Sequence, residues 1–125
     1  MKMLHTCYRV KDLEKAVAFY KDALGFEEAR RKDFPEAEFT LVYMVVPGSS
    51  HELELTYNYG HPAYELGNGY SHIAVGTEDL DALHAKHKAA GYEVTEPSGL
   101  PGSPPSHYFI TDPDGYDIEV VRLAK

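Results

Sequence analysis

The sequence is poor in cysteine, since Cys7 is the only one in 125 residues. A single cysteine excludes a disulfide within the chain, so a buried core has to stabilise the fold, and a reducing compartment is expected. No apolar run approaches the roughly 20 residues of a membrane-spanning helix, and no signal peptide is recognisable. We therefore expect a cytoplasmic protein.

Positive charge is also scarce. The chain has 12 Lys and Arg residues against 20 Asp and Glu residues, which gives a net charge of −8. Nucleic acids and anionic membranes bind clustered Lys and Arg, so neither is an expected partner. The length fits one domain, and the 43% share of hydrophobic residues is ordinary for a globular protein. We expect residues 1–125 to form a single domain.

The sequence contains a weak internal repeat. Each copy opens with a histidine in a strand-like segment, His5 or His72. In both copies an Asp-Leu pair begins seven residues later, and a glycine follows the histidine by 20 or 19 residues. The glutamate of an apolar-Glu-apolar triplet, Glu54 or Glu119, comes 49 or 47 residues after the histidine. Such a repeat indicates that one structural plan is used twice.

Each copy predicts the order strand, helix, strand, strand, strand. The first helix is expected from an N-cap at Asp12 to a stop at Gly25, and the second is expected to stop at Gly91. The buried stripe of the second helix is expected at Leu80, Leu83, His87 and Ala90. The later strands are FEEARRKDF, FTLVYMVV and HELELTYN in the first copy, and YEVTE, SHYFITD and YDIEVVRL in the second. The chain thus predicts an α+β fold of two βαβββ modules, about residues 1–60 and 69–125, joined by a loop.

The repeat selects one histidine and one glutamate from each copy as candidate metal ligands, namely His5, Glu54, His72 and Glu119. Strand alternation puts Glu119 on a face with Val121 and Leu123, and we expect this apolar face to turn inward. A carboxylate there has to be neutral, ion-paired or bound to a metal. Two imidazoles and two carboxylates form a mixed nitrogen and oxygen site that suits Zn²⁺, Ni²⁺, Co²⁺, Fe²⁺ or Mn²⁺.

Other candidate ligands have simpler explanations. His84 and His87 are three residues apart on the expected second helix, where packing accounts for them. Cys7 is expected to be a small buried residue. Glu52 shares a strand face with Glu54 and is expected to meet solvent.

Four segments follow one another along nearly the whole chain: LHTCYRVKDLEKAVAFYKDALGF, ELTYNYG, YELGNGYSHIAV and DPDGYDIE. Together they resemble the glyoxalase I (lactoylglutathione lyase) family of the vicinal oxygen chelate superfamily. The resemblance implies paired βαβββ modules with barrel-like sheets. It also implies a homodimer with metal sites at the subunit interface.

By position, the resemblance implies that the four metal ligands are His5, Glu54, His72 and Glu119. A histidine as the first ligand in so short a chain resembles the branch of the family that prefers Ni²⁺ or Co²⁺ to Zn²⁺. A divalent ion of this kind is the implied cofactor.

The implied activity is isomerisation of the hemithioacetal of methylglyoxal and glutathione, or another small thiol, to an S-lactoylthiol, which detoxifies methylglyoxal. A proton moves from C1 to C2 through a cis-enediolate, and a divalent cation can stabilise its two neighbouring oxygens as a Lewis acid. Glu119 resembles the family's C-terminal ligand and is the candidate base, with Glu54 serving the opposite face. Arg9 and Asn58 resemble residues that contact the glutathione part of the substrate.

Two positions depart from the family pattern. Many relatives have a basic residue where this chain has Asn68, and a lysine in the loop that here reads GLPGSPPSH, residues 99–107. Those positive charges would meet the glycyl carboxylate of glutathione. A different small thiol is therefore an open alternative.

Other functions of the same fold are alternatives to the lyase. They are a metal-dependent epimerase, thiol transferase or dioxygenase, and a metal-free drug-binding module. The enzymes generally have a different ligand set, and the metal-free modules usually lack the ligands. We favour the lyase because all four ligand positions are filled here.

Overall fold

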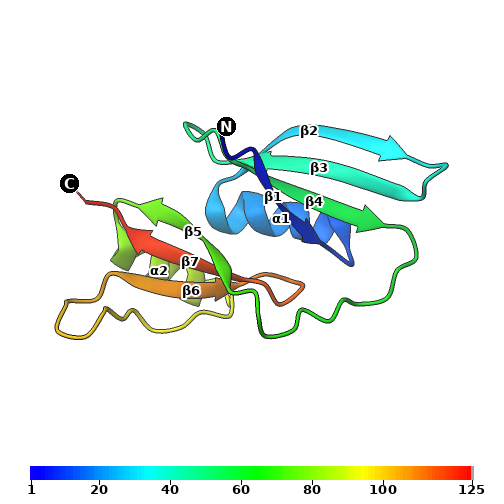
Figure 1. Ribbon diagram of the computed structural model, residues 1–125. Coiled ribbons are helices and arrows are strands. Elements are labelled where there is room, and N and C mark those ends of the chain that lie inside the picture. The colour runs from blue at the N-terminus through cyan, green and yellow to red at the C-terminus, as the bar shows by residue number, and fades with distance from the viewer. Residues whose placement is uncertain (125) are drawn as a thin grey trace. The chain divides into compact units, whose positions relative to one another are not determined.

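The computed structural model describes residues 1–124, and the chain divides into two units, Met1–Glu65 and Leu66–Lys125. Each unit contains one helix and one small sheet (Figure 1). None of the described helices is long and apolar enough to cross a membrane.

The first unit contains a four-stranded sheet in the order β1-β4-β3-β2. Its elements are β1 (His5–Arg9), α1 (Leu13–Leu24), β2 (Glu27–Phe34), β3 (Phe39–Val45) and β4 (Glu52–Asn58). β1 and β4 run parallel, and the chain connects them through α1, β2 and β3. The other neighbouring strands are antiparallel.

Strand alternation decides which face of this sheet is buried. Leu53 and Leu55 on β4 are 3% and 0% exposed, whereas Glu52 and Glu54, which alternate with them, are only half-buried. Successive side chains of a strand point to opposite faces, so the leucines form a core with α1 and the carboxylates lie on the other face. The face that α1 leaves uncovered is therefore the polar one.

α1 begins and ends at signals that the sequence carries. The side chain of Asp12 accepts a hydrogen bond from the Lys15 N–H at 3.2 Å, which makes it the N-cap. Gly25 has φ of 70°, and its N–H bonds to the Lys21 carbonyl. This left-handed conformation favours glycine, which stops the helix. Both predicted ends of the first helix are confirmed.

Arg31 on β2 connects the sheet to α1 through ion pairs. Its guanidinium lies 2.7 Å from Glu14 on α1 and 2.9 Å from Glu28 on β2. The hydrogen bond from Arg31 lowers the pKa of Glu28 below its usual value. Exposed ion pairs stabilise only weakly, so we expect Arg31→Met to reduce the free energy of unfolding by about 1 kcal/mol at pH 7.

The loss of unfolding free energy caused by Arg31→Met should depend on pH. A carboxylate whose folded pKa is lowered stabilises the fold above its unfolded pKa, and this contribution is lost as the pH falls through the folded pKa. The difference in unfolding free energy between the wild type and Arg31→Met should therefore decrease below about pH 4. Urea unfolding of the metal-free protein from pH 7 downward measures it, with Lys32→Met as a control that removes a neighbouring cation without a described ion pair. A cost that does not change with pH would contradict this role of Glu28.

The second unit repeats the parallel pair. It contains β5 (His72–Thr77), α2 (Leu80–Ala89), β6 (His107–Thr111) and β7 (Asp117–Arg122), with sheet order β5-β7-β6. β5 and β7 are parallel, as β1 and β4 are. In both pairs the glutamate lies opposite the residue two positions after the histidine, with Glu54 opposite Cys7 and Glu119 opposite Ala74. This shared register confirms the repeat that the sequence predicts.

The strand predicted for YEVTE does not form a regular strand in the described residues. Val94 in this segment makes an isolated bridge to Ile110 instead, and Ser98 just after it makes another to His107. The Thr95 hydroxyl accepts the Phe109 N–H at 2.9 Å, and the Thr95 carbonyl accepts a hydrogen bond from His84 Nε2 at 3.0 Å. Pro97 has no N–H to donate. Backbone bonds still join Glu93, Thr95 and Ser98 to β6, but they do not form a continuous ladder, and the fourth strand of this module is reduced to an edge segment.

α2 buries a different stripe from the predicted one. Leu80, His84 and His87 are 0%, 8% and 1% exposed, whereas Leu83 is half-buried and Ala90 is exposed. Imidazoles can occupy core positions when they have hydrogen-bond partners, and His87 Nδ1 lies 2.9 Å from a buried tyrosine hydroxyl. Both histidines are packing residues, as expected, although the stripe follows positions 80, 84 and 87.

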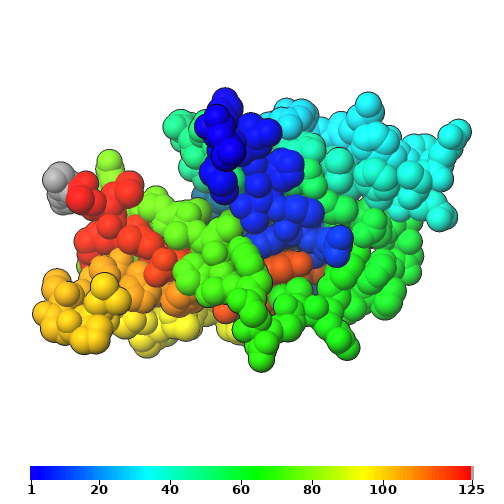
Figure 2. Space-filling view, viewed as in Figure 1, coloured from blue at the N-terminus to red at the C-terminus, as the bar shows by residue number. Residues whose placement is uncertain are grey.

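Residues 59–71 contain no helix or strand, which confirms the predicted loop. Most of their side chains are exposed, and this segment lies at the surface in green in Figure 2. Tyr64 stacks on His61 with ring centroids 4.1 Å apart, and its hydroxyl accepts a hydrogen bond from Asn58 at the end of β4. The first part of the loop is thus held to the sheet.

Candidate metal centre

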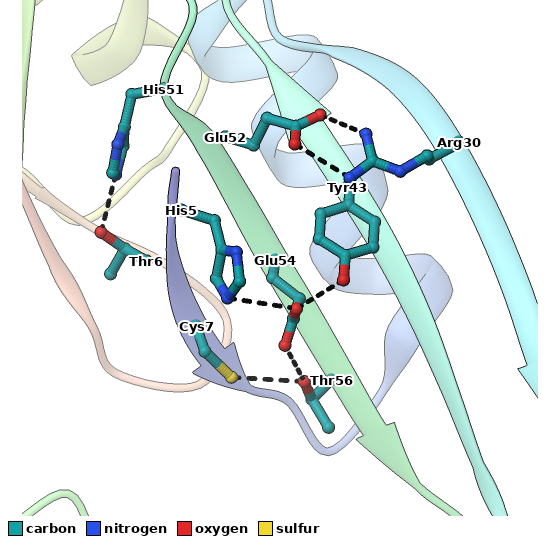
Figure 3. A network of polar contacts seen from close by, with 9 residues as sticks. All are labelled: His5, Thr6, Cys7, Arg30, Tyr43, His51, Glu52, Glu54 and Thr56. Atoms are coloured by element: carbon teal, nitrogen blue, oxygen red, sulfur yellow. Dashed lines mark hydrogen bonds and ion pairs between the residues drawn. The ribbon is translucent and has the colours of Figure 1, made fainter. Parts of the chain in front are cut away.

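β1 and β4 bring the two predicted ligands of the first unit together. His5 Nε2 lies 3.4 Å from Glu54 Oε2 on the polar face of the sheet (Figure 3). The His5 side chain is 40% exposed and that of Glu54 is 13% exposed. A solvent ion can therefore reach the pair, while the carboxylate is held by its surroundings.

Two hydroxyl groups hold the carboxylate of Glu54. Tyr43 donates to Oε2 at 2.7 Å, and Thr56 donates to Oε1 at 3.1 Å. Burial by itself raises the pKa of Glu54, but the hydrogen bonds from Tyr43, Thr56 and Cys7 outweigh burial and lower it. Glu54 is therefore ionised and fixed in orientation, as suits a metal ligand.

β5 and β7 form the matching pair in the second unit. His72 Nε2 lies 3.5 Å from Glu119 Oε1, with side chains 28% and 24% exposed. Ser71 Oγ lies 2.5 Å from His72 Nδ1, which leaves Nε2 facing the carboxylate. Within residues 66–124, His72 is the only side chain in hydrogen-bond or ion-pair contact with the Glu119 carboxylate. Glu119 thus lacks the two hydroxyl partners that fix Glu54.

Glu119 does not share its face with the core, and the inward orientation predicted for it was wrong. Ile118 and Val120 are 0% exposed and form the buried face of β7. Val121 on the Glu119 face is half-buried, and Leu123 is 47% exposed. β7 carries apolar residues on both faces, so alternation could not tell which one α2 would cover.

The donors of the two pairs fit a divalent cation. Imidazole nitrogen and carboxylate oxygen together suit borderline ions such as Zn²⁺, Ni²⁺ and Co²⁺. Two ligands at right angles on such an ion, with bonds of about 2.1 Å, lie roughly 3 Å apart. The observed separations of 3.4 and 3.5 Å need only a small adjustment. Over the residues described, no group of three or more His, Cys, Asp or Glu side chains that could hold a metal is found, and each pair supplies two donors.

The predicted substrate-binding residues end the two central strands of the first unit. Arg9 is the last residue of β1, exposed, and on the same face as His5. Asn58 is the last residue of β4 and is half-buried. Its side-chain amide donates to the Tyr64 hydroxyl at 2.8 Å. Each residue lies four positions after the candidate ligand of its strand, and therefore on the same face as that ligand.

Cys7 is exposed, so its prediction as a small buried residue was wrong. It lies on the face that α1 leaves uncovered, because it alternates with the buried Tyr8. Its Sγ lies 3.3 Å from Thr56 Oγ1. Desolvation raises the pKa of the thiol, and the nearby Glu54 carboxylate adds to this effect. The sulfur is therefore a protonated thiol at neutral pH.

Sequence reasoning missed the residues that surround Glu54. Glu52 was expected to meet solvent, but its carboxylate accepts hydrogen bonds from Arg30 at 2.5 and 3.0 Å. Arg30 Cζ in turn lies 3.9 Å from the ring centroid of Tyr43. The alternation of β3 could have put Tyr43 on its polar face. Only the pairing of β3 with β4 aligns Tyr43 with Glu54.

Residues 2–120 match the family model of the Glyoxalase/Bleomycin resistance protein/Dioxygenase superfamily. The chain belongs to this superfamily. The match spans both His–Glu pairs, and the repeated helix-and-sheet unit is therefore the fold of the glyoxalase superfamily.

Several relatives within the glyoxalase superfamily match along almost their full length. A probable lactoylglutathione lyase from Synechocystis is 42% identical, over 99% of this chain and 97% of that protein. The lactoylglutathione lyase of Haemophilus influenzae is 40% identical, over 98% of this chain and 93% of that protein. The solved structure of the trypanothione-dependent glyoxalase I of Leishmania major is 38% identical, with a TM-score of 0.86, and the match covers 98% of this chain and 86% of that one.

Proposed function

We propose that this protein is a lactoylglutathione lyase (glyoxalase I), which isomerises the hemithioacetal of methylglyoxal and glutathione, or of another small thiol, to the S-lactoylthiol. The observation that carries the proposal is the pair of matched His–Glu contacts, one in each unit and in the same strand register. The full-length relatives that bear this enzyme name support it. The reaction detoxifies methylglyoxal.

A divalent metal ion is the proposed cofactor, held by His5, Glu54, His72 and Glu119. We propose Ni²⁺ or Co²⁺ rather than Zn²⁺, because a short chain with a histidine as first ligand resembles the branch of the family that prefers these two ions. When bound, the ion supplies Lewis-acid stabilisation of the two neighbouring substrate oxygens that gain charge during the reaction. Two imidazoles and two carboxylates leave the ion room for these oxygens.

The two glutamates have different tasks in this proposal. Glu119 removes the proton from C1 of the hemithioacetal and returns it to C2, so the carbon skeleton is isomerised without an external oxidant or reductant. This assignment fits its surroundings, because only His72 contacts its carboxylate within the second unit, in the residues described. Glu54 is held by two hydroxyls and keeps mainly its role as a ligand, facing the opposite side of the substrate.

Arg9 and Asn58 are the proposed contacts of the thiol part of the substrate. A guanidinium binds a carboxylate through two hydrogen bonds, which suits Arg9 for the γ-glutamyl end. The chain has no cation at Asn68 or in residues 99–107 for the other, glycyl carboxylate. The thiol is therefore to be tested rather than assumed, and the trypanothione dependence reported for the Leishmania major enzyme suggests a second thiol to compare.

Turnover by the purified protein tests the proposal. Metal-stripped protein receives Ni²⁺, Co²⁺ or Zn²⁺ and then the methylglyoxal hemithioacetal of glutathione or trypanothione, and thioester formation is followed by absorbance. We expect turnover that depends on added metal, with Ni²⁺ or Co²⁺ more active than Zn²⁺. No thioester with either thiol and any of the three ions would refute the lyase.

We further propose that residues 1–125 act as one domain in a homodimer, with active sites at the subunit interface. In the residues described, each unit offers one His–Glu pair and no larger group of donors, so two copies can complete two sites by exchanging pairs. The exposed thiol of Cys7 fits a reducing compartment, which supports a cytoplasmic location.

Mixed dimers test the shared site. One chain carries His5→Ala with Glu54→Ala, and the other carries His72→Ala with Glu119→Ala. If each site takes one pair from each subunit, mixing two inactive homodimers should restore about a quarter of the wild-type activity, because half of the dimers have one intact site of two. Activity that stays absent after subunit exchange, or an active monomer in sedimentation, would contradict the interface site.

A further inference from the structure

A continuous row of side chains crosses the polar face of the first sheet behind Glu54. Arg30 on β2 is paired with Tyr43 on β3, and Tyr43 is paired with Glu54 on β4. The contacts follow the same order, since the Arg30 guanidinium stacks on the Tyr43 ring and the Tyr43 hydroxyl donates to Glu54 Oε2. Figure 3 shows this row ending at His5 on β1.

Tyr43 touches both members of the His–Glu pair. Besides its hydrogen bond to Glu54, its ring packs edge-on against the His5 imidazole, with centroids 5.9 Å apart. Thr56 satisfies the other carboxylate oxygen. The carboxylate therefore cannot turn without breaking a hydrogen bond, and the oxygen that faces His5 is the one that Tyr43 holds.

A β-bulge brings Arg30 to this row. β2 pairs regularly with β3 up to Glu28, but the register then shifts so that Arg30, and not Ala29, lies opposite Tyr43. Bulges re-aim side chains, and they are common beside functional sites. The two hydrogen bonds to Glu52 then fix the plane of the guanidinium over the Tyr43 ring.

We propose that Tyr43 and Arg30 are positioning residues of the metal centre, with Tyr43 orienting the Glu54 carboxylate and Arg30 fixing the Tyr43 ring. This inference rests on the proposed function, because it takes Glu54 as a metal ligand. Hydrogen bonds to metal ligands set their orientation, and loss of such a partner typically weakens metal binding by about 10- to 100-fold. We expect this loss for Tyr43→Phe, which removes only the hydroxyl.

The sign of the Arg30 effect separates positioning from simple electrostatics. A guanidinium near the site repels a divalent cation, so charge alone predicts that Arg30→Met binds metal more tightly. Positioning through Tyr43 predicts weaker binding. Arg30 is 57% exposed, and exposed ion pairs contribute little to folding stability, so the variant should remain folded.

Metal affinity of the metal-free full-length protein is the main measurement, made by competition with a coloured chelator for Co²⁺ and Ni²⁺. The matched controls are Tyr57→Phe, a hydroxyl deletion on β4 on the opposite face, and Arg31→Met, which removes the neighbouring guanidinium. We expect unchanged affinity in both controls, a 10- to 100-fold loss in Tyr43→Phe and a smaller loss in Arg30→Met. Thermal unfolding of each metal-free variant checks that the fold is retained.

Turnover as a function of metal concentration supplies a second readout. We expect kcat at saturating metal to stay within about threefold of wild type for both variants, while the half-saturating metal concentration rises. Wild-type affinity in Tyr43→Phe, or equal or tighter binding in Arg30→Met, would overturn the inference. If the wild type binds metal but shows no turnover, the lyase proposal alone fails. If the wild type binds no metal, Glu54 is not a ligand and both proposals fail.

Discussion

Replacing Glu119 by glutamine is expected to lower kcat by about 10²- to 10⁴-fold, the range over which a positioned proton-transfer group accelerates a reaction. Glutamine keeps an oxygen that can ligate a metal, but it cannot accept the C1 proton. The variant should therefore retain a large part of its bound metal while losing turnover. Metal content and steady-state kinetics on the same preparation measure the two effects separately.

Glu54→Gln is the informative comparison for Glu119→Gln. Glu54 is fixed by Tyr43 and Thr56, so its loss should act mainly through metal affinity, and excess metal should recover part of the activity. Glu93→Gln, an exposed glutamate of the second unit, is a control that should leave kcat unchanged. If Glu54→Gln lost turnover with metal bound and Glu119→Gln did not, the roles of the two carboxylates would have to be exchanged.

Replacing His72 by alanine is expected to have the second large effect, the loss of both metal retention and turnover. The imidazole is one of two donors that the second unit offers, and no other side chain of its described residues can replace it beside Glu119. Loss of a ligand should exceed the roughly 100-fold effect of losing a ligand's partner. Metal content after gel filtration and activity with added Ni²⁺ measure it.

His61→Ala is a suitable control for His72→Ala, because His61 is an exposed histidine whose ring contacts the loop residues Pro62 and Tyr64. We expect it to keep its metal and its activity. Equal losses from the two changes would mean that a general histidine-dependent association with metal had been mistaken for a specific site. Full metal retention by His72→Ala would remove His72 from the ligand set.

The sequence predicted the repeated plan and the pairing of ligands within each unit. The spacing from histidine to glutamate is nearly equal in the two copies, and the structure gives both pairs the same strand register. The polar face of β4 also followed from alternation, because side chains repeat with a period of two along a strand. Where only one face of a strand is apolar, as with Leu53 and Leu55 on β4, this period predicts which face is buried.

The same rule failed where a strand is apolar on both sides. β7 has Ile118 and Val120 on one face and Val121 and Leu123 on the other, so the sequence pattern could not show which face of β7 is buried. The predicted buried stripe of α2 was wrong for a related reason. Leu83 was expected in the core because it is apolar, but the hydrogen-bonded His84 is buried instead. The segment after α2 is joined to β6 by isolated bridges, and Pro97 within it has no N–H with which to continue the ladder.

By itself the sequence determined which histidine and which glutamate pair within each unit, because the repeat puts them at matching positions on strands whose side chains alternate with a period of two. Tertiary structure alone decided which side chains surround Glu54. Tyr43 meets Glu54, and Arg30 meets Tyr43, only through the pairing of three strands and a bulge of one residue. Pairing between strands is set by packing over the whole sheet, and a shift of a single residue would have turned each of these side chains away.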